Sequence, residues 1–227
     1  MKNTNKILLI VQRSNGDVYL CLNLIKELYK YYNSPQIDIL VNDDTFSLAR
    51  LLPFITNIHT FSYAKKRDGR WAQEIKIVKD IFRKYDLSIN LTASDRSVLY
   101  VILASKKSIS AIEMNKNKSW WKKLLLFKYY HFNKNQHIFL NNLEPLNLLN
   151  INYEYNLEPI KASSKAINRV KKILLNLGIK EFFVFHPSAQ YNYKIYPKNL
   201  RDQLLSYLSS MGIPILVTGS NNKIDND

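Results

Sequence analysis

The first half of the chain alternates apolar runs with stretches of helical periodicity, and this alternation narrows the possible folds more than any other feature. Strands separated by helices form parallel sheets that are covered on both faces. We therefore predict a doubly wound, Rossmann-like α/β domain. The predicted strands are 7–11, 36–42, 58–63, 87–92 and 107–112, and the predicted helices are one through Leu20, Leu24 and Leu28 and those at 44–52, 71–85 and 94–104.

The pattern changes after the fifth predicted strand. Residues 119–132 and 137–150 are predicted to be helices with no strand between them, and 152–164 has no clear period and indicates a linker. A second α/β series then follows. Its predicted elements are a helix at 165–177, the strand FFVFHPS, a helix near 199–210 and the strand PILVTGS.

This organisation predicts two domains, at residues 1–155 and 156–227. A domain usually has about a hundred residues or more, whereas the second series ends after two strands. We therefore expect the second domain to be incomplete, as it would be in a truncated chain or in the product of a gene fragment.

The chain is strongly basic. Its 33 lysine and arginine residues outnumber its 18 aspartate and glutamate residues, which gives a formal net charge of +15. Such a charge favours nucleic acid, an anionic membrane or a phosphorylated substrate as a partner. A bias toward lysine without a particular partner explains the same charge, so both interpretations stay open at this point.

Cysteine and histidine usage restricts the chemistry. The single cysteine, Cys21, excludes a disulfide scaffold and indicates a reducing compartment. It falls inside the first predicted helix, where we expect a small buried side chain and not a nucleophile. The four histidines are scattered, and no cluster has the spacing of metal ligands, so we predict no metal site. No apolar run is long enough to span a membrane, and the first one is expected to be a strand and not a signal peptide.

The turn after the first strand has an unusual composition. A strand, a glycine turn and a helix together form the phosphate-binding unit of many α/β proteins. Here the turn from Ser14 to Asp17 has one glycine instead of three, and it places an acid at the start of the helix, where it would repel phosphate. On the residues alone, a helix-capping role for Asp17 is favoured over a catalytic one.

Three segments stand in an informative order. They are SNGDVYL in the first turn, FHPSAQYNYKIYP at the start of the second domain and ILVTGS at its next strand. Together they resemble glycosyltransferase family 9, the ADP-heptose:lipopolysaccharide heptosyltransferases, which carry a Ser-x-Gly-Asp turn and a later His-Pro-Gly and Lys-x-Trp-Pro. The resemblance implies the GT-B architecture, with two facing Rossmann-like domains of which the second is incomplete here.

The resemblance also implies a role for the acid in the first turn. It implies that Asp17 is the general base that takes a proton from the acceptor hydroxyl during inverting transfer. The exposed amides of a helix N-terminus stabilise a carboxylate in this position. Gly16 would let the acceptor approach the backbone closely.

For the donor, the resemblance implies that Lys194 contacts the phosphates of the nucleotide sugar and offsets their charge as the diphosphate leaves. Ser188 follows the preceding strand and is a second candidate for phosphate binding. Tyr196 stands where the family usually has tryptophan. The alternative for Lys194 is an ordinary solvated lysine.

Two stretches fit an anionic acceptor and a membrane. The family places basic residues after the third strand for phosphate and carboxylate groups of the acceptor, and arginine suits bidentate contacts of this kind. The matching residues are Lys65, Lys66, Arg67 and Arg70. Residues 119–132 mix lysines with aromatic residues and are expected to rest on an acidic membrane surface. A core helix with solvated lysines is the alternative for this stretch.

The resemblance therefore predicts a glycosyltransferase that needs neither metal nor cofactor. It would move a heptose or a related sugar from an ADP-sugar to phosphorylated lipid A and core oligosaccharide, in the cytoplasm at the inner face of the inner membrane, with no nucleic acid partner. A later Asp-Thr/Ser-Gly-x-x-His segment of the family is missing, and Asn221 replaces an acid near the last strand. Two alternatives remain, a basic α/β protein that binds RNA or another polyanion and a non-catalytic transferase fragment.

Overall fold

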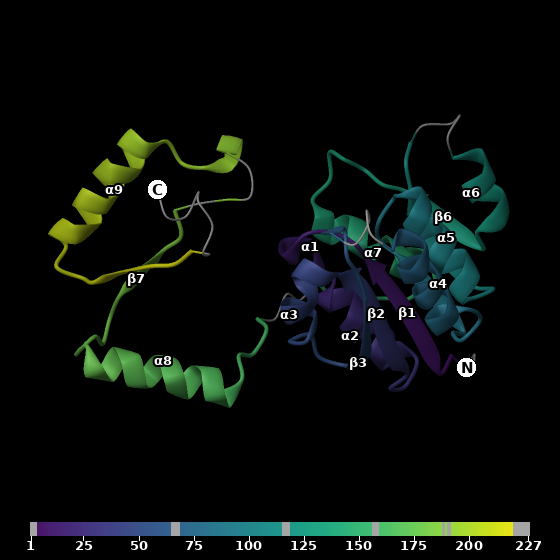
Figure 1. The fold of residues 1–227 in the computed structure, drawn as a ribbon, viewed down its shortest axis with the longest axis horizontal. Coiled ribbons are helices and arrows are strands. Elements are labelled where there is room, and N and C mark those ends of the chain that lie inside the picture. Colours follow the sequence, from purple (N-terminus) through teal and green to yellow (C-terminus); the bar gives the residue numbers. More distant parts are fainter. Residues whose placement is uncertain are drawn as a thin grey trace. The chain divides into compact units, whose positions relative to one another are not determined.

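The computed structural model describes residues 4–64, 69–114, 119–155, 159–187, 189 and 192–219 (Figure 1). The chain forms two compact units, Met1–Lys161 and Ala162–Asp227. In the described part of the chain, no helix is both long and apolar enough to cross a lipid bilayer.

The first unit is built on a parallel sheet of six strands with the order β3-β2-β1-β4-β5-β6. This arrangement confirms the predicted α/β class with a parallel sheet. Successive strands add outward from β1 on one side and from β4 on the other, so the order reverses between these two strands. The strands are β1 (Lys6–Val11), β2 (Gln36–Asn42), β3 (Ile55–Phe61), β4 (Leu87–Asn90), β5 (Ser108–Ile112) and β6 (Lys128–His131).

Helices cover both faces of the sheet, and each face has its own hydrophobic core (Figure 1). Side chains of β1 alternate between the two faces, as the two-residue period of a strand requires. Ile7 and Leu9 pack with residues of α2 and α7, whereas Leu8 and Ile10 pack with residues of α4 and α5. The helices are α1 (Asn15–Tyr19), α2 (Leu22–Tyr31), α3 (Phe46–Ala49), α4 (Arg70–Ile81), α5 (Asp95–Ala104), α6 (Trp120–Leu125) and α7 (Ile138–Leu148), with a 3₁₀ turn η1 (Asp43–Thr45) before α3.

The sixth strand corrects the prediction of a single helix at 119–132. In the structure α6 ends at Leu125, and β6 follows and pairs in parallel with β5, with Ile109 opposite Lys128. The burial of β6 alternates, because Tyr130 is buried while both of its neighbours in the strand are exposed. This alternation spans four residues, which is too short to stand out beside a longer run of lysines and aromatic residues.

Two other boundaries differ from the prediction. The first predicted helix is divided into α1 and α2, and the division lets both Val18 and Cys21 be buried in the same core. Strand β3 begins at Ile55, three residues before its predicted start. It is the edge strand of the sheet, and Thr56 and Asn57 are exposed, so its first residues do not show an apolar pattern.

Cys21 is fully buried, which confirms the expectation from the sequence. Burial raises the pKa of its thiol to about 12, and a thiol that stays protonated reacts slowly. We therefore expect Ellman's reagent at pH 8 to leave the native chain unmodified and to label one thiol per chain after unfolding in guanidinium chloride. Rapid labelling of the native chain would show that the first core is open to solvent.

The second unit contains the predicted helix–strand–helix–strand series. Its strands pair in parallel, with Phe183 opposite Ile215. None of the residues of α8 or α9 is buried, and Val184 in the first strand of the unit is 63% exposed. The apolar faces of this unit are therefore largely open to solvent. Its elements are α8 (Ser164–Asn176), β7 (Phe183–Phe185), the 3₁₀ turn η3 (Asn192–Lys194), α9 (Lys198–Ser210) and β8 (Ile215–Val217).

Candidate functional site

The first unit has its candidate site where the strand order reverses. In open parallel sheets, ligands bind beyond the carboxyl ends of the strands at such a reversal, because neighbouring loops there turn to opposite faces and leave a crevice. The loops that leave β1 and β4 flank this position, and they carry residues 12–14 and 91–94. The Asp17 turn follows the first of these loops.

Asp17 lies in the first turn of α1 and is held by two side chains. Its Oδ2 atom accepts a hydrogen bond from the Ser14 hydroxyl at 3.0 Å and another from Arg13 Nε at 3.2 Å. The residue at the N-cap of α1 is Ser14, so Asp17 is not the cap that the residues alone favoured. Both bonds end on Oδ2, and in the part of the chain that the structure describes no bond involves Oδ1. The carboxylate is thus fixed through one oxygen while the other can meet a ligand.

Arg13 is a residue of this site that the sequence analysis missed. Its guanidinium carbon lies 4.8 Å from the centre of the Phe132 ring, and its side chain is 28% exposed. The arginine is therefore held between the end of β6 and the acid at the start of α1. A lone arginine after a strand belongs to no motif, so only the folded chain reveals this contact.

Gly16 precedes Asp17, and its α-carbon faces open space. A Cβ atom built at this residue would meet no heavy atom within 4 Å, and its backbone has no positive φ angle. The glycine is therefore not required by the turn itself. The close approach of a ligand to this backbone stays a prediction.

The two donor candidates belong to the second unit. Lys194 is exposed at the end of η3, with its Nζ atom 5.7 Å from the centre of the Tyr193 ring. Ser188 lies outside the described residues. His186, which follows β7, is joined to Thr218 after β8 by a 3.2 Å hydrogen bond, so it ties the two strand ends together. The approach of Lys194 to Asp17 stays a prediction.

Of the four expected acceptor residues, only the backbone of Arg70 belongs to the described part of the first unit, which also contains a groove. Lys65, Lys66 and Arg67 fall outside the described residues, and Arg70 begins α4 with a side chain that is likewise not described. The groove has a volume of about 500 Å³ and runs between β3 and α4, with Gly69 in its wall. Its lining is mostly polar and includes Asp43, His59, Thr60, Ser62, Gln73, Lys76 and Asp80.

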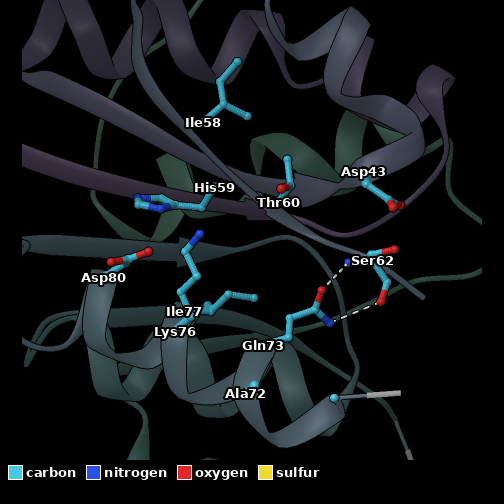
Figure 2. A pocket seen from close by; sticks show the side chains of 11 residues that line it. Asp43, Ile58, His59, Thr60, Ser62, Ala72, Gln73, Lys76, Ile77 and Asp80 are labelled. Carbon is cyan, nitrogen blue, oxygen red and sulfur yellow. Dashed lines mark hydrogen bonds between the residues drawn. The ribbon is translucent and has the colours of Figure 1, made fainter. Parts of the chain in front are cut away.

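Figure 2 shows how the two ends of this groove differ. At one end, Gln73 binds the backbone of Ser62 twice, accepting from its N–H at 2.9 Å and donating to its carbonyl at 3.1 Å. At the other end, Lys76 extends from α4 toward β3, near His59 and Asp80. A groove with both charges and several hydroxyl groups suits a polar, many-hydroxyl ligand better than an apolar one.

Beneath the groove, a chain of hydrogen bonds connects His59 to a buried carboxylate. The Tyr85 hydroxyl donates to Asp38 Oδ2 at 2.8 Å and lies 3.1 Å from His59 Nε2. The proton of the hydroxyl is used by Asp38, so His59 Nε2 must donate to Tyr85. Asn57 gives Asp38 two further bonds, from its N–H at 3.1 Å and from its amide at 3.0 Å. This network satisfies a carboxylate that is 4% exposed and is therefore a structural feature of β2 and β3.

Burial in this network lowers the pKa of His59, although Asp38 and Asp80 oppose the shift. The unfolded chain therefore binds a proton more readily at this residue than the folded chain. We expect the free energy of unfolding of the first unit to fall as the pH drops below about 6.5, the ordinary pKa of histidine. Urea unfolding at several pH values should show a smaller fall for His59→Gln, whose amide can still donate to Tyr85. The exposed His131→Gln is the control, and equal slopes for both variants would contradict the prediction.

Within the described ranges, no group of three or more histidine, cysteine, aspartate or glutamate side chains is placed to hold a metal ion.

No family model matches the chain. The sequence is 26% identical over 213 residues to lipopolysaccharide heptosyltransferase 3 of Escherichia coli K12, and this match covers 91% of the chain and 60% of that protein. The chain therefore spans about three fifths of the length of this curated relative.

Solved structures share the fold of this chain. A glycosyl transferase family 9 protein from Veillonella parvula has a TM-score of 0.79 at 13% identity, with 97% of this chain and 64% of that chain covered. The E. coli heptosyltransferase WaaC, solved with ADP-2-deoxy-2-fluoro heptose, has a TM-score of 0.70 at 18% identity, with 95% and 70% covered. The curated relative and the solved structures point the same way as the order of the three motifs: the chain is similar in sequence to a lipopolysaccharide heptosyltransferase and in fold to a glycosyl transferase family 9 protein.

Proposed function

We propose that this sequence carries the acceptor site and part of the donor site of a lipopolysaccharide heptosyltransferase. The first unit binds phosphorylated lipid A with its core sugars, and the second unit binds the ADP-sugar through Lys194 and Ser188. The similarity to lipopolysaccharide heptosyltransferase 3 supports this class of substrate. The observation that carries the proposal is the Asp17 carboxylate, which is held through Oδ2 at the reversal of the strand order and keeps Oδ1 available.

The geometry suits inverting transfer. In this reaction the acceptor hydroxyl gives its proton to Asp17 Oδ1 as its oxygen attacks the anomeric carbon, and the bond to the ADP leaving group breaks on the opposite face. Arg13 and Ser14 keep the base in place. Lys194 offsets the negative charge that develops on the leaving diphosphate. The reaction as proposed uses side chains of the protein, with no cofactor and no metal ion.

The test combines a binding and a transfer measurement. Calorimetry with the 227-residue chain should detect binding of lipid A with a heptose-deficient core, and this binding should weaken as salt is added. The product of the natural gene, given ADP-heptose and the same acceptor, should yield an acceptor that is heavier by one heptose in mass spectrometry. The proposal would be overturned if RNA displaced the acceptor from the chain and no heptosylated product formed.

We also propose that the surface of α6 and β6 rests on the anionic inner face of the membrane. Burial in α6 is the reverse of what a core helix with solvated lysines would show. Trp120 and Leu124 are 66% and 76% exposed, whereas Lys122 is fully buried. The alternative of a core helix with solvated lysines is therefore wrong for Lys122. Lys123 and Lys128 lie over the rings of Tyr129 and Phe127, so cations and aromatic groups alternate on this surface.

Vesicle flotation tests this membrane contact. The chain should float with vesicles that contain phosphatidylglycerol and stay behind with vesicles of phosphatidylcholine alone, because both the aromatic groups and the charge are required. Trp120→Ser together with Leu124→Ser should reduce flotation. The double variant Leu175→Ser and Leu177→Ser, in an equally exposed apolar part of α8 and the turn after it, is the control. Equal losses for both double variants would remove the assignment of this surface.

A further inference from the structure

Arg96 occupies an unusual position at the carboxyl edge of the first sheet. It lies in the first turn of α5, after the loop that leaves β4. The carbon of its guanidinium is 3.7 Å from the centre of the Phe61 ring and 5.0 Å from that of Tyr63. Its Nη2 atom donates a 2.8 Å hydrogen bond to the Tyr63 hydroxyl. The guanidinium is thus fixed in plane and position between the end of β3 and the start of α5.

The positive charge of Arg96 has no carboxylate partner in the part of the chain that the structure describes. Asp95, its neighbour in the sequence, pairs with Lys122, and Glu74 of α4 accepts from the Tyr100 hydroxyl of α5. The Nε atom of Arg96 is buried and has no hydrogen-bond acceptor within the same described residues. This environment therefore has more donors than acceptors.

The position of Arg96 in the first turn of α5 adds to the excess of positive charge. The N-terminus of a helix carries a partial positive charge, so a cation in the first turn is destabilising and an anion is stabilising. The contacts with Phe61 and Tyr63 hold the side chain but do not neutralise its charge, and a buried polar atom without a partner in a native protein calls for an explanation, which a bound anion would supply.

We propose that Arg96 is an oxyanion-binding residue that takes a phosphate or a carboxylate group. Stacking on Phe61 fixes the plane of the guanidinium before the ligand arrives, and such a fixed fork matches the geometry of both groups. The site lies on the β4 side of the strand reversal, whereas Asp17 lies on the β1 side. The inference rests on the proposed function in one respect, because the acceptor is taken to supply the anionic group. Arg96, after β4, would then join the basic residues that are expected to bind the acceptor after β3.

The experiment titrates the 227-residue chain with inorganic phosphate and, separately, with acetate at constant ionic strength, and follows binding by NMR. Wild-type chain should bind phosphate, and Arg96→Gln should weaken this binding by about 10- to 100-fold, the usual effect of losing hydrogen bonds to a charged group. Arg96→Lys keeps the charge and loses the planar fork, so its affinity for phosphate should lie between those of the wild-type chain and Arg96→Gln. Preference for phosphate or acetate identifies which group the site takes.

Arg50→Gln is the matched control, because Arg50 is an exposed arginine whose guanidinium carbon lies 5.8 Å from the centre of the Phe46 ring. This variant loses the same charge and should bind phosphate nearly as well as the wild-type chain. Equal losses in the two glutamine variants, or a wild-type chain that binds neither anion, would overturn the proposal. If Arg96→Gln does not fold, full binding by a folded Arg96→Lys would overturn it as well. None of these readouts uses heptose transfer, so a failed transfer assay leaves this inference to be judged on its own.

Discussion

In the product of the natural gene, Asp17→Asn should lower the rate of the proposed heptose transfer by about 100- to 10,000-fold, the usual contribution of a positioned general base. The asparagine side chain has nearly the same shape, and its carbonyl oxygen can still accept the bonds that Ser14 and Arg13 now give to Oδ2. The substitution therefore removes the proton acceptor and leaves the turn in place. Transfer would be measured with ADP-heptose and a heptose-deficient acceptor, and kcat should fall while the KM for the donor stays unchanged.

The control is Asp44→Asn, which changes the same chemical group on the exposed surface of η1. It should transfer heptose at the wild-type rate. Arg13→Gln provides a second comparison, because it removes one of the two contacts that position the carboxylate and should reduce kcat less than Asp17→Asn. If Asp17→Asn kept the wild-type rate, the base would have to be another residue, and the whole assignment of the β1 turn would fail.

The parallel sheet of the first unit could be predicted from the sequence because its signals are local. Strands β1 and β2 are buried on both faces, and each appears in the sequence as an apolar run that in β2 is interrupted by Asp38. Strand β4 is equally buried, although its residues alternate between apolar and polar. The burial of Cys21 was predicted from its place inside the first predicted helix. Edge positions give weaker signals, and both errors of the strand prediction lie there: β3 began earlier than expected and β6 was assigned to a helix.

The contacts that define the site could not be predicted in the same way, because they join residues that are distant in the sequence. Arg13 meets Phe132, and Arg96 meets Phe61, only after four or more strands have paired around them. A motif marks the residue at its own position and does not indicate what packs against it. The resemblance therefore identified Asp17 but not the arginine that holds it.

The ion pair between Lys122 and Asp95 is another contact that the sequence could not predict, and we expect its loss to have a large effect on stability. Lys122 of α6 is fully buried, and its ammonium group pairs with Asp95 of α5, whose side chain is 74% exposed. Strand β5 separates these two residues in the sequence. Their ion pair fixes α6 against the first turn of α5, next to Arg96. Together with Trp121, which packs against the second core, this ion pair holds α6 while Trp120 and Leu124 stay exposed.

Asp95→Asn should destabilise the first unit by about 3 kcal/mol, near the lower end of the usual cost of removing one partner from a buried ion pair. The lower end applies because the carboxylate is itself largely in water. Lys122→Met should change the stability little, since it removes the buried charge and keeps a side chain of similar length and apolar character. An ordinary surface pair would instead lose less than about 1 kcal/mol with either substitution.

Thermal unfolding measures this asymmetry directly. For a unit of this size, about 3 kcal/mol corresponds to a drop in Tm of roughly 6–12 °C. The double variant Asp95→Asn with Lys122→Met should recover most of the loss, because no unpaired charge is then left inside. Any stability that the double variant does not recover measures the favourable interaction of the Asp95 carboxylate with the N-terminus of α5. If Lys122→Met destabilised the chain as much as Asp95→Asn, the lysine would be contributing through its pairing and packing instead, and the buried charge would not be the cause.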